Sequence, residues 1–492
     1  MKDLKEKTVR GGLARVIAQG LNFAFRLGSL MVLARLLGPR DFGLVGMVTA
    51  FTGVLGLFRD FGLSTASVQR ASITEEQVST LFWINVLVGL ILAGLASALA
   101  PMVAAFYHEP RLVWVTAVLA TGFLFNAAGV QHSALLQREL RFTALAVIST
   151  VALVVSTAIA VAMAELGYGY WALVAMTVTL PLINTIGCWL ASRWIPGAPR
   201  KRTGIRSMMR FGGTITLNGL VVYIAYNLEK VLLGRYWGAE VIGLYGRAYQ
   251  LINIPTDNMN TAVGEVAFSA LSRVQDDRTR LRSYFLKGYS LVIGVTLPIT
   301  LACALFANDL ILVLLGPKWM EAVAIFRLLA PTILIFGIIN PLGWLLMSLG
   351  MVGRSLKIAL VIAPLVIAGY VAGLPYGPKG VALGYSVSMT LWVIPHIVWC
   401  VHGTGISVRD MGRAVGQPLL SGVAAAVLAF GVQFFYGQSL PPLARLALGG
   451  TVLSGAYLVM LLYVMGQKAF YLDLVRGFRK GTAVDEKVLA SA

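Results

Sequence analysis

A row of charged and amide side chains runs through a segment that is apolar enough to cross a membrane. The segment from about residue 12 to residue 37 is long enough to span a bilayer. It carries polar residues at steps of four, three, four and three, which places them on one helical face: Arg15, Gln19, Asn22, Arg26 and Ser29. An arginine near a bilayer centre costs about 2.5–3.5 kcal/mol on insertion scales, so such a face is expected to look into a polar cavity. The feature therefore indicates a polytopic membrane protein with a cationic interior, suited to transport of an anionic solute.

Composition places the whole chain in the membrane class. Its 492 residues are 58% hydrophobic and only 12% charged, with a mean hydropathy of +0.79, whereas soluble domains contain roughly 25% charged residues. We expect an all-α polytopic protein with about 14 transmembrane helices. The expected spans are residues 12–37, 41–63, 80–106, 111–132, 142–165, 169–194, 211–235, 239–268, 284–307, 322–349, 353–373, 378–402, 412–436 and 443–466.

The distribution of basic residues predicts the orientation of the spans. With the N-terminus inside, the even-numbered connections and the two tails hold 27 of the 40 lysines and arginines, and the external connections hold 6. This asymmetry follows the positive-inside rule, so both termini and the tail 467–492 are expected to be cytoplasmic. The net charge of +19 is therefore explained by topology. We expect no nucleic-acid partner, although the basic runs are suited to contact anionic membrane lipid.

Short matches between the two halves of the chain suggest an internal repeat. Leu21-Asn22 precedes Leu36-Leu37-Gly38 at the same spacing as Leu217-Asn218 precedes Leu232-Leu233-Gly234. Downstream, the sequence GLVG at 43–46 echoes GLYG at 243–246. We expect an N-lobe of six spans at 1–200, a C-lobe of six spans at 201–405, and two extra helices at 406–466. Parallel halves of this kind bind substrate between them near the bilayer midplane.

Three further spans carry polar stripes, and they occupy matching places in the two halves. The second span has Thr49, Thr52, Gly56 and Arg59, and the seventh has Thr216, Tyr223, Asn227 and Lys230. The eighth has a stripe with steps of three, three, four and three, followed by Glu265 about one residue off it: Arg247, Gln250, Asn253, Asp257 and Asn260. We expect the first, second, seventh and eighth helices to line a central cavity, with Asp257 as its deepest acid.

Structural roles compete with these functional ones. Arg59 lies near a span end, where its side chain could reach the interface, and Lys230 could pair with a carboxylate on another helix. No Walker loop, zinc-protease motif, nucleophile elbow or dinucleotide fingerprint is present, and the three cysteines have no metal-ligand spacing. We therefore expect no catalytic residues, no metal and no cofactor.

Several motifs together resemble one known group of transporters. The stretches LARLLGPRDFGLVGMVTAF, FRDFGLSTASVQR, LQRELRF, and GRAYQL followed by SRVQDD resemble the oligosaccharide flippases of the MOP exporter superfamily. The nearest branch is the polysaccharide biosynthesis proteins that serve capsule, O-antigen (lipopolysaccharide) and exopolysaccharide synthesis. The resemblance runs from about Leu13 to Tyr463.

The resemblance implies a function, a location and a set of partners. It implies a multi-pass protein of the bacterial inner membrane that moves an undecaprenyl-diphosphate-linked oligosaccharide from the cytoplasmic to the periplasmic leaflet by alternating access. It also implies a possible coupling to H⁺ or Na⁺ and a functional link to a polysaccharide polymerase and chain-length machinery. The cavity arginines of the related lipid II flippases do not match Arg15, Arg26 and Arg59 in spacing, so only the idea of a cationic cavity is transferred.

The hypothesis for the site follows from the stripes and the expected diphosphate cargo. The ion-coupling residues are expected to be Asp257 and Glu265. The substrate-binding residues are expected to be Arg15, Gln19, Asn22, Arg26, Arg59, Asn218, Asn227, Lys230, Arg247, Gln250 and Asn253. Two alternatives stay open: an ion-coupled multidrug or cation exporter of the same superfamily, and a membrane polysaccharide polymerase, which usually needs a long external loop.

Overall fold

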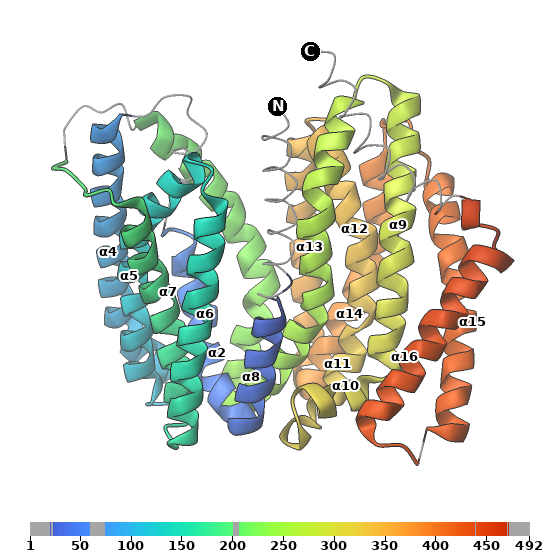
Figure 1. The fold of residues 1–492 in the computed structure, drawn as a ribbon, viewed down its shortest axis with the longest axis horizontal. Coiled ribbons are helices and arrows are strands. Elements are labelled where there is room, and N and C mark those ends of the chain that lie inside the picture. Colours follow the sequence, from blue (N-terminus) through green and yellow to red (C-terminus); the bar gives the residue numbers. More distant parts are fainter. Residues whose placement is uncertain are drawn as a thin grey trace. The chain divides into compact units, whose positions relative to one another are not determined.

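The protein is an assembly of long helices, as the computed structural model in Figure 1 shows. The structure describes residues 23–59, 74–199, 206–437 and 439–469, together with Gly20 and Tyr471. Within these ranges every regular element is helical, and residues 23–36 form the first helix. The following elements are α2 (Pro39–Gly56), α4 (Glu75–Tyr107), α5 (Leu112–Arg138), α6 (Phe142–Glu165), α7 (Tyr170–Ser192), α8 (Arg206–Arg273), α9 (Arg278–Leu305), α10 (Ala307–Leu314), η1 (Pro317–Trp319), α11 (Ala322–Leu329), α12 (Pro331–Ser348), α13 (Val352–Gly373), η2 (Leu374–Tyr376), α14 (Gly377–Val401), α15 (Val408–Tyr436), α16 (Pro442–Val459) and η3 (Met460–Val464).

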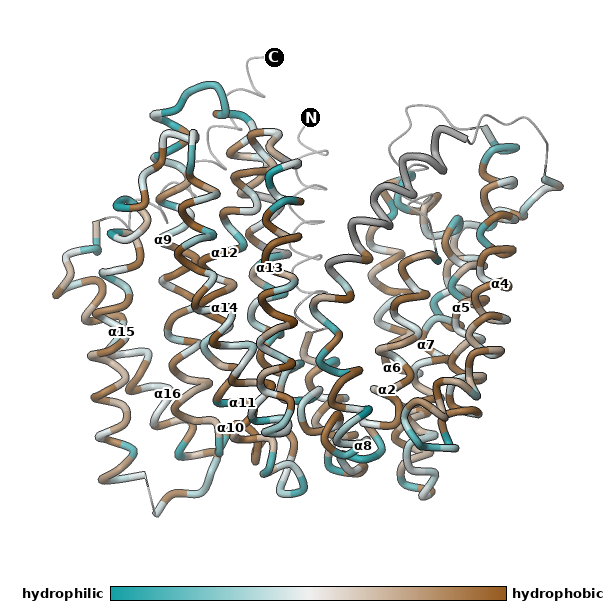
Figure 2. The backbone as a smooth tube through the Cα atoms, turned by 180° about the vertical axis from the view of Figure 1, so that it is seen from behind, coloured by the Kyte–Doolittle hydropathy of each residue, from teal (hydrophilic) through white to brown (hydrophobic). Residues whose placement is uncertain are grey.

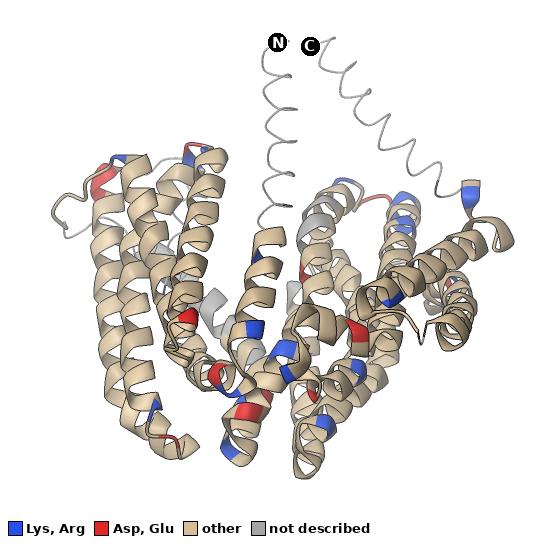
Figure 3. Ribbon diagram, turned by 60° about the horizontal axis from the view of Figure 1, so that its bottom comes forward, with Lys and Arg blue, Asp and Glu red and all other residues tan. Residues whose placement is uncertain are grey.

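The helices coincide with the expected membrane spans. Nine helices in the described part of the chain are long and apolar enough to cross a bilayer, and each expected span overlaps a helical segment. Apolar residues dominate the helices, and many hydrophilic ones lie at ends and connections (Figure 2). After Glu75 and Glu76 in its first turn, the rest of α4 carries no charged residue. In Figure 3, likewise, long stretches of α4–α7 are free of charge. The chain is therefore an all-helical polytopic membrane protein.

Local sequence signals set where several helices begin. At α4 the Thr74 hydroxyl accepts from the Gln77 backbone N–H at 3.3 Å, and the Gln77 amide oxygen accepts from the Thr74 N–H at 3.1 Å. Ser407 and Asp410 make the same reciprocal pair at the start of α15. Each pair satisfies backbone donors that a helix start otherwise leaves without partners.

Two arginine side chains cap the C-terminal ends of helices. Arg141 donates to the carbonyl of Ala191 at the end of α7, at 2.9 Å, and Arg354 donates to the carbonyl of His402 just beyond α14, at 2.6 Å. The cations meet carbonyls with no intrahelical partner, at the negative end of the helix dipole. These arginines therefore stabilise the fold at loops that also carry the basic topology signal.

The chain forms two compact units. Unit 1 comprises residues up to Arg247 together with 314–321 and 363–381, and unit 2 comprises 248–313, 322–362 and 382 onward. In unit 1, α4 packs on α5, α5 on α7 and α7 on α6, which gives the row of helices seen in Figure 1. In unit 2, α9 packs against α12 and α15, and α15 against α16.

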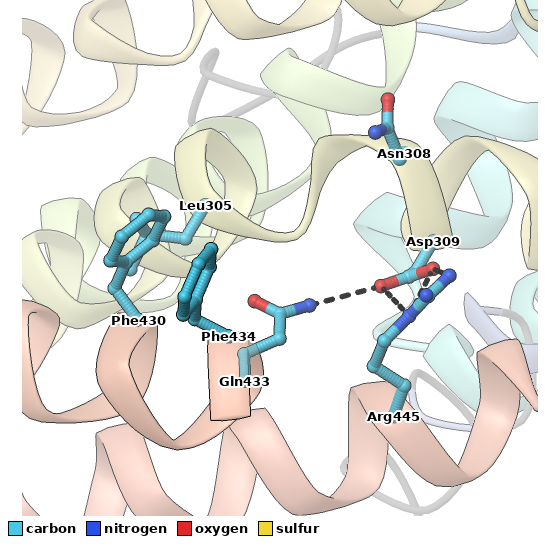
Figure 4. Close-up of a pocket in the computed structure, with 7 residues that line it drawn as sticks. All are labelled: Leu305, Asn308, Asp309, Phe430, Gln433, Phe434 and Arg445. Carbon is cyan, nitrogen blue, oxygen red and sulfur yellow. Dashed lines mark hydrogen bonds and ion pairs between the residues drawn. The ribbon is translucent and has the colours of Figure 1, made fainter. Parts of the chain in front are cut away.

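A buried polar cluster joins three segments of unit 2. Asp309 on α10 accepts from the Arg445 Nε at 2.9 Å and from Gln433 Nε2 at 3.2 Å (Figure 4). The Asp309 side chain is only 3% exposed. Beside it, Phe306, Ala425, Ala429 and Leu453 form part of an apolar core. The ion pair thus fixes α10 against the ends of α15 and α16.

Candidate functional site

Two glycines bring α2 and α8 into backbone contact within unit 1. Gly43 on α2 faces the carbonyl of Ala239, and Gly243 on α8 faces the carbonyl of Pro39; neither position has room for a Cβ atom. The helical path of α8 breaks at Gly238, whose φ of 84° favours glycine. The contact is reciprocal: on each helix the glycine faces the carbonyl of the residue that stands four positions before the other helix's glycine.

Farther along, the first part of α8 continues to pack on α2. The Tyr223 hydroxyl lies 3.3 Å from the carbonyl of Ala50 and 3.5 Å from that of Thr49. Gly53 leaves the space that the phenol occupies. Tyr223 of the stripe expected on the seventh span therefore packs against α2 beside Thr49, and this line of contact is the seam of α2 and α8.

Lys230 and Asn227 lie on this part of α8 and interact directly. The Lys230 Nζ donates to the Asn227 side-chain oxygen at 2.8 Å, as their spacing of three residues allows. Both side chains are half-buried. Together they offer a cation and an amide to an anionic group.

Glu229 is a buried acid that the sequence pattern did not single out. Its side chain is fully buried, and neither carboxylate oxygen has a hydrogen-bond partner within the described structure. A buried polar group without a partner is costly, so its retention needs a reason. The sequence signal that could have identified Glu229 is its position next to Lys230 inside an expected span.

Arg247 is held by an aromatic stack. Its guanidinium carbon lies 4.0 Å from the centre of the Phe42 ring. Phe42 packs edge-on against Trp319, whose Nε1 donates to the carbonyl of Ala34 at 2.8 Å. Sequence reasoning found Arg247 but not its platform, because Trp319 comes from a distant part of the chain.

Arg59 borders a polar cavity within unit 1. The cavity has a volume of about 230 Å³ and lies against α5 and α7. Its polar lining residues are Arg59, Asn126, Ser133, Gln137, Asn184 and Thr185. The interior Nε of Arg59 has no hydrogen-bond partner within the described structure. Apart from Arg59, these residues were missed, although steps of seven and four along α5 place Asn126, Ser133 and Gln137 on one face.

The remaining stripe of α8 lies in unit 2. Gln250 and Asp257 are exposed and Asn253 is half-buried. Asn260 accepts a hydrogen bond from Trp344 Nε1 at 3.1 Å, which gives it a packing role. Asp257, expected to be the deepest acid, is thus an exposed side chain, and the buried acids among the described residues are Glu229 and Asp309.

Part of the predicted site lies outside the described residues. Arg15, Gln19 and Asn22 lie outside the described residues, as do the side chains of Asn218 and Glu265. Arg26 is described and its side chain is exposed. The described residues include no cluster of three or more His, Cys, Asp or Glu side chains able to hold a metal ion.

Comparison with known proteins places the chain in a family. Residues 32–324, more than half of the chain, match the family described as "Polysaccharide biosynthesis protein". The chain is 27% identical over 439 residues to the lipopolysaccharide biosynthesis protein WzxC of Escherichia coli K12, covering 87% of this chain and 88% of that protein. It is 31% identical over 296 residues to the teichuronic acid biosynthesis protein TuaB of Bacillus subtilis, covering 59% and 61% of the two chains.

Solved structures show the same fold. The lipid II flippase MurJ, in an inward closed conformation, superposes with a TM-score of 0.73 at 13% identity, covering 94% of this chain and 99% of that one. An inward-facing multidrug resistance MATE transporter of the MOP superfamily gives a TM-score of 0.63 at 15% identity, covering 78% and 94%. The fold is therefore that of MOP superfamily transporters, and the chain belongs to the polysaccharide biosynthesis protein family.

Proposed function

We propose that this protein is a flippase that carries an undecaprenyl-diphosphate-linked oligosaccharide across the bacterial inner membrane. The cargo moves from the cytoplasmic to the periplasmic leaflet by alternating access, for capsule, O-antigen or exopolysaccharide synthesis. The observation that carries the proposal is the cationic and amide-lined seam of α2 and α8, in a transporter fold whose relatives are named for polysaccharide biosynthesis. The protein is accordingly a transporter rather than an enzyme.

The chemistry of the seam fits a diphosphate. Phosphate oxygens accept hydrogen bonds and carry negative charge, which lysine and arginine match. Lys230 with Asn227, and Arg247 on its Phe42 platform, present such groups within unit 1. We assign Arg15 and Arg26 to the same task, with Gln19, Asn22, Asn218, Gln250 and Asn253 as hydrogen-bonding partners of the head group, and we assign Arg59 to the sugar part of the cargo.

The proposal includes an orientation and a division into lobes. Both termini face the cytoplasm, in keeping with the basic loops, and the lobes are 1–200 and 201–405. The reciprocal contacts of Gly43 and Gly243 support this repeat, since equivalent positions meet each other. The polymerase and chain-length machinery act next on the delivered oligosaccharide.

Complementation of a flippase-deficient polysaccharide strain tests the function. We expect wild type to restore surface polysaccharide, and Arg26→Ala and Arg247→Ala to fail at normal membrane levels on a blot. Arg193→Ala, an exposed arginine just beyond α7, is the matched control and should restore it. Active Arg26→Ala and Arg247→Ala variants would refute the cationic site. If wild type fails with several repeat units but confers drug resistance, the multidrug or cation exporter is the better reading.

Ion coupling is a separate proposal that rests on Asp257, with Glu265 as the second candidate. Because an exposed acid within a membrane-spanning helix is retained at a cost unless it faces water, we expect Asp257 to bind H⁺ or Na⁺ during transport. Asp257→Asn should therefore abolish the dependence of transport on the ion gradient, measured in vesicles with the gradient imposed or collapsed. Glu240→Gln, an exposed acid on the same helix, is the control. Unchanged gradient dependence in Asp257→Asn would exclude this residue and make Glu229 the next candidate.

A further inference from the structure

The cavity beside Arg59 is a built polar site inside unit 1. It lies between the turn that ends α2 and the facing surfaces of α5 and α7, and it holds about 230 Å³. At roughly 30 Å³ per water molecule this is about eight waters. One sugar ring fits such a space.

The hydrogen-bonding groups of the cavity are only partly used. Asn126 donates through Nδ2 to the Gly122 carbonyl at 3.0 Å, which leaves its side-chain oxygen as an acceptor. Gln137 donates to the Ser133 hydroxyl at 3.4 Å, which also leaves an acceptor oxygen. The buried Nε of Arg59 has no partner within the described structure. No carboxylate stands among the described lining residues to neutralise this guanidinium.

This combination selects for a particular chemical class. A phosphate only accepts hydrogen bonds and would use only the remaining N–H groups of Asn126 and Gln137, whereas sugar hydroxyls both donate and accept and can also use the two amide oxygens. A single guanidinium suits one carboxylate, which it can bind through two parallel hydrogen bonds. The lining therefore fits a hydroxyl-rich ring that bears one acidic group.

We propose that this cavity binds one acidic sugar residue of the oligosaccharide, with its carboxylate on Arg59 and its hydroxyls on Asn126, Gln137 and Asn184. The inference rests on the proposed function and adds a substrate class to it: repeat units that contain a uronic acid. The cavity thereby selects the cargo by its sugar, whereas the seam of α2 and α8 holds the diphosphate that all such cargoes share.

Binding to the purified full-length protein in nanodiscs tests the inference. The probes are undecaprenyl diphosphate, its glucose–glucose derivative and its glucose–glucuronic acid derivative. We expect wild type to bind the glucuronic acid derivative at least tenfold more tightly than the neutral one. Arg59→Gln should remove this preference without changing the affinity for undecaprenyl diphosphate, and Asn184→Leu should weaken both sugar-linked lipids.

The controls distinguish failure of the acidic-sugar site from failure of the flippase function itself. Arg193→Gln, beyond the end of α7 and outside the cavity, should bind all three lipids as wild type does. A wild type without sugar preference, or an Arg59→Gln protein that keeps it, would show that the cavity holds only water and overturn the inference while the flippase function stands. If wild type binds none of the three lipids, the proposed function itself fails. Should Arg59→Gln not purify as a monodisperse protein, Asn184→Leu and Gln137→Leu give the same decision through their weakened sugar binding.

Discussion

Gly243→Ala is expected to abolish complementation, whereas Gly246→Ala, one turn away on the same helix, should leave it intact. A methyl group at Gly243 would collide with the carbonyl of Pro39, and one at Gly246 would meet no atom within 4 Å. Overpacking a close contact costs about 1–3 kcal/mol and more where nothing can move. Here the obstacle is backbone, so α2 and α8 must separate. At Gly246 the exchange should instead stabilise the helix by about 0.8–1 kcal/mol.

The reciprocal contact supplies a second, independent comparison. Gly43→Ala should behave like Gly243→Ala because it meets the carbonyl of Ala239, and Gly56→Ala should behave like Gly246→Ala because its surroundings are open. Thermal unfolding in detergent and complementation are measured for all four variants. Since the two contacts belong to one crossing, the double variant should lose less stability than the two single losses added. Equal behaviour of Gly243→Ala and Gly246→Ala would mean that the crossing is open in the membrane.

The spans could be predicted from hydropathy, but their ends and breaks could not. The expected span 322–349 is one span, Ala322–Ser348, in which Pro331 interrupts the hydrogen bonding between α11 and α12 while the backbone of Ala330 stays helical. The seventh and eighth spans run on as α8, interrupted only by the geometry of Gly238. The length of an apolar run is matched to the thickness of the bilayer, so hydropathy finds the spans. The residue at which a helix begins or ends depends on its capping residues and on the backbone conformation of single residues.

Helical periodicity found the part of the site that lies along one helix. It brought Asn227 and Lys230 together, because residues three apart share a face. It could not find that Phe42 carries Arg247, or that Asn184 on α7 faces the cavity of Arg59, because those contacts join distant segments. It also undervalued Glu229, whose burial depends on neighbouring helices rather than on spacing.

The ion pair of Asp309 and Arg445 also joins distant segments, so helical periodicity could not predict it. Breaking this ion pair is expected to cause a large loss of stability. In sequence, Arg445 lies at the start of the expected span 443–466, where no spacing indicates a partner, yet its side chain is bound to an acid 136 residues away. We expect Arg445→Ala to destabilise the protein by about 3–5 kcal/mol, since it leaves a buried carboxylate without its cation. Asp309→Ala should cost less, because the arginine left behind is 27% exposed whereas the aspartate is 3% exposed. Thermal unfolding of the purified variants gives this order directly.

Replacing both partners distinguishes the charge from the packing. With Asp309→Leu and Arg445→Leu together, neither charge remains uncompensated, so most of the stability lost in Arg445→Ala should return. Gln433 would then lose its acceptor, but it lines an open pocket where water can take that place (Figure 4). Asn308→Ala, in the same pocket but outside the ion pair, is the control and should unfold like wild type. If Asp309→Ala proved as damaging as Arg445→Ala, the cost would lie in lost contacts between α10 and α16 rather than in a buried charge. The loss would then persist in the double leucine variant, so the two measurements together decide what holds this end of unit 2.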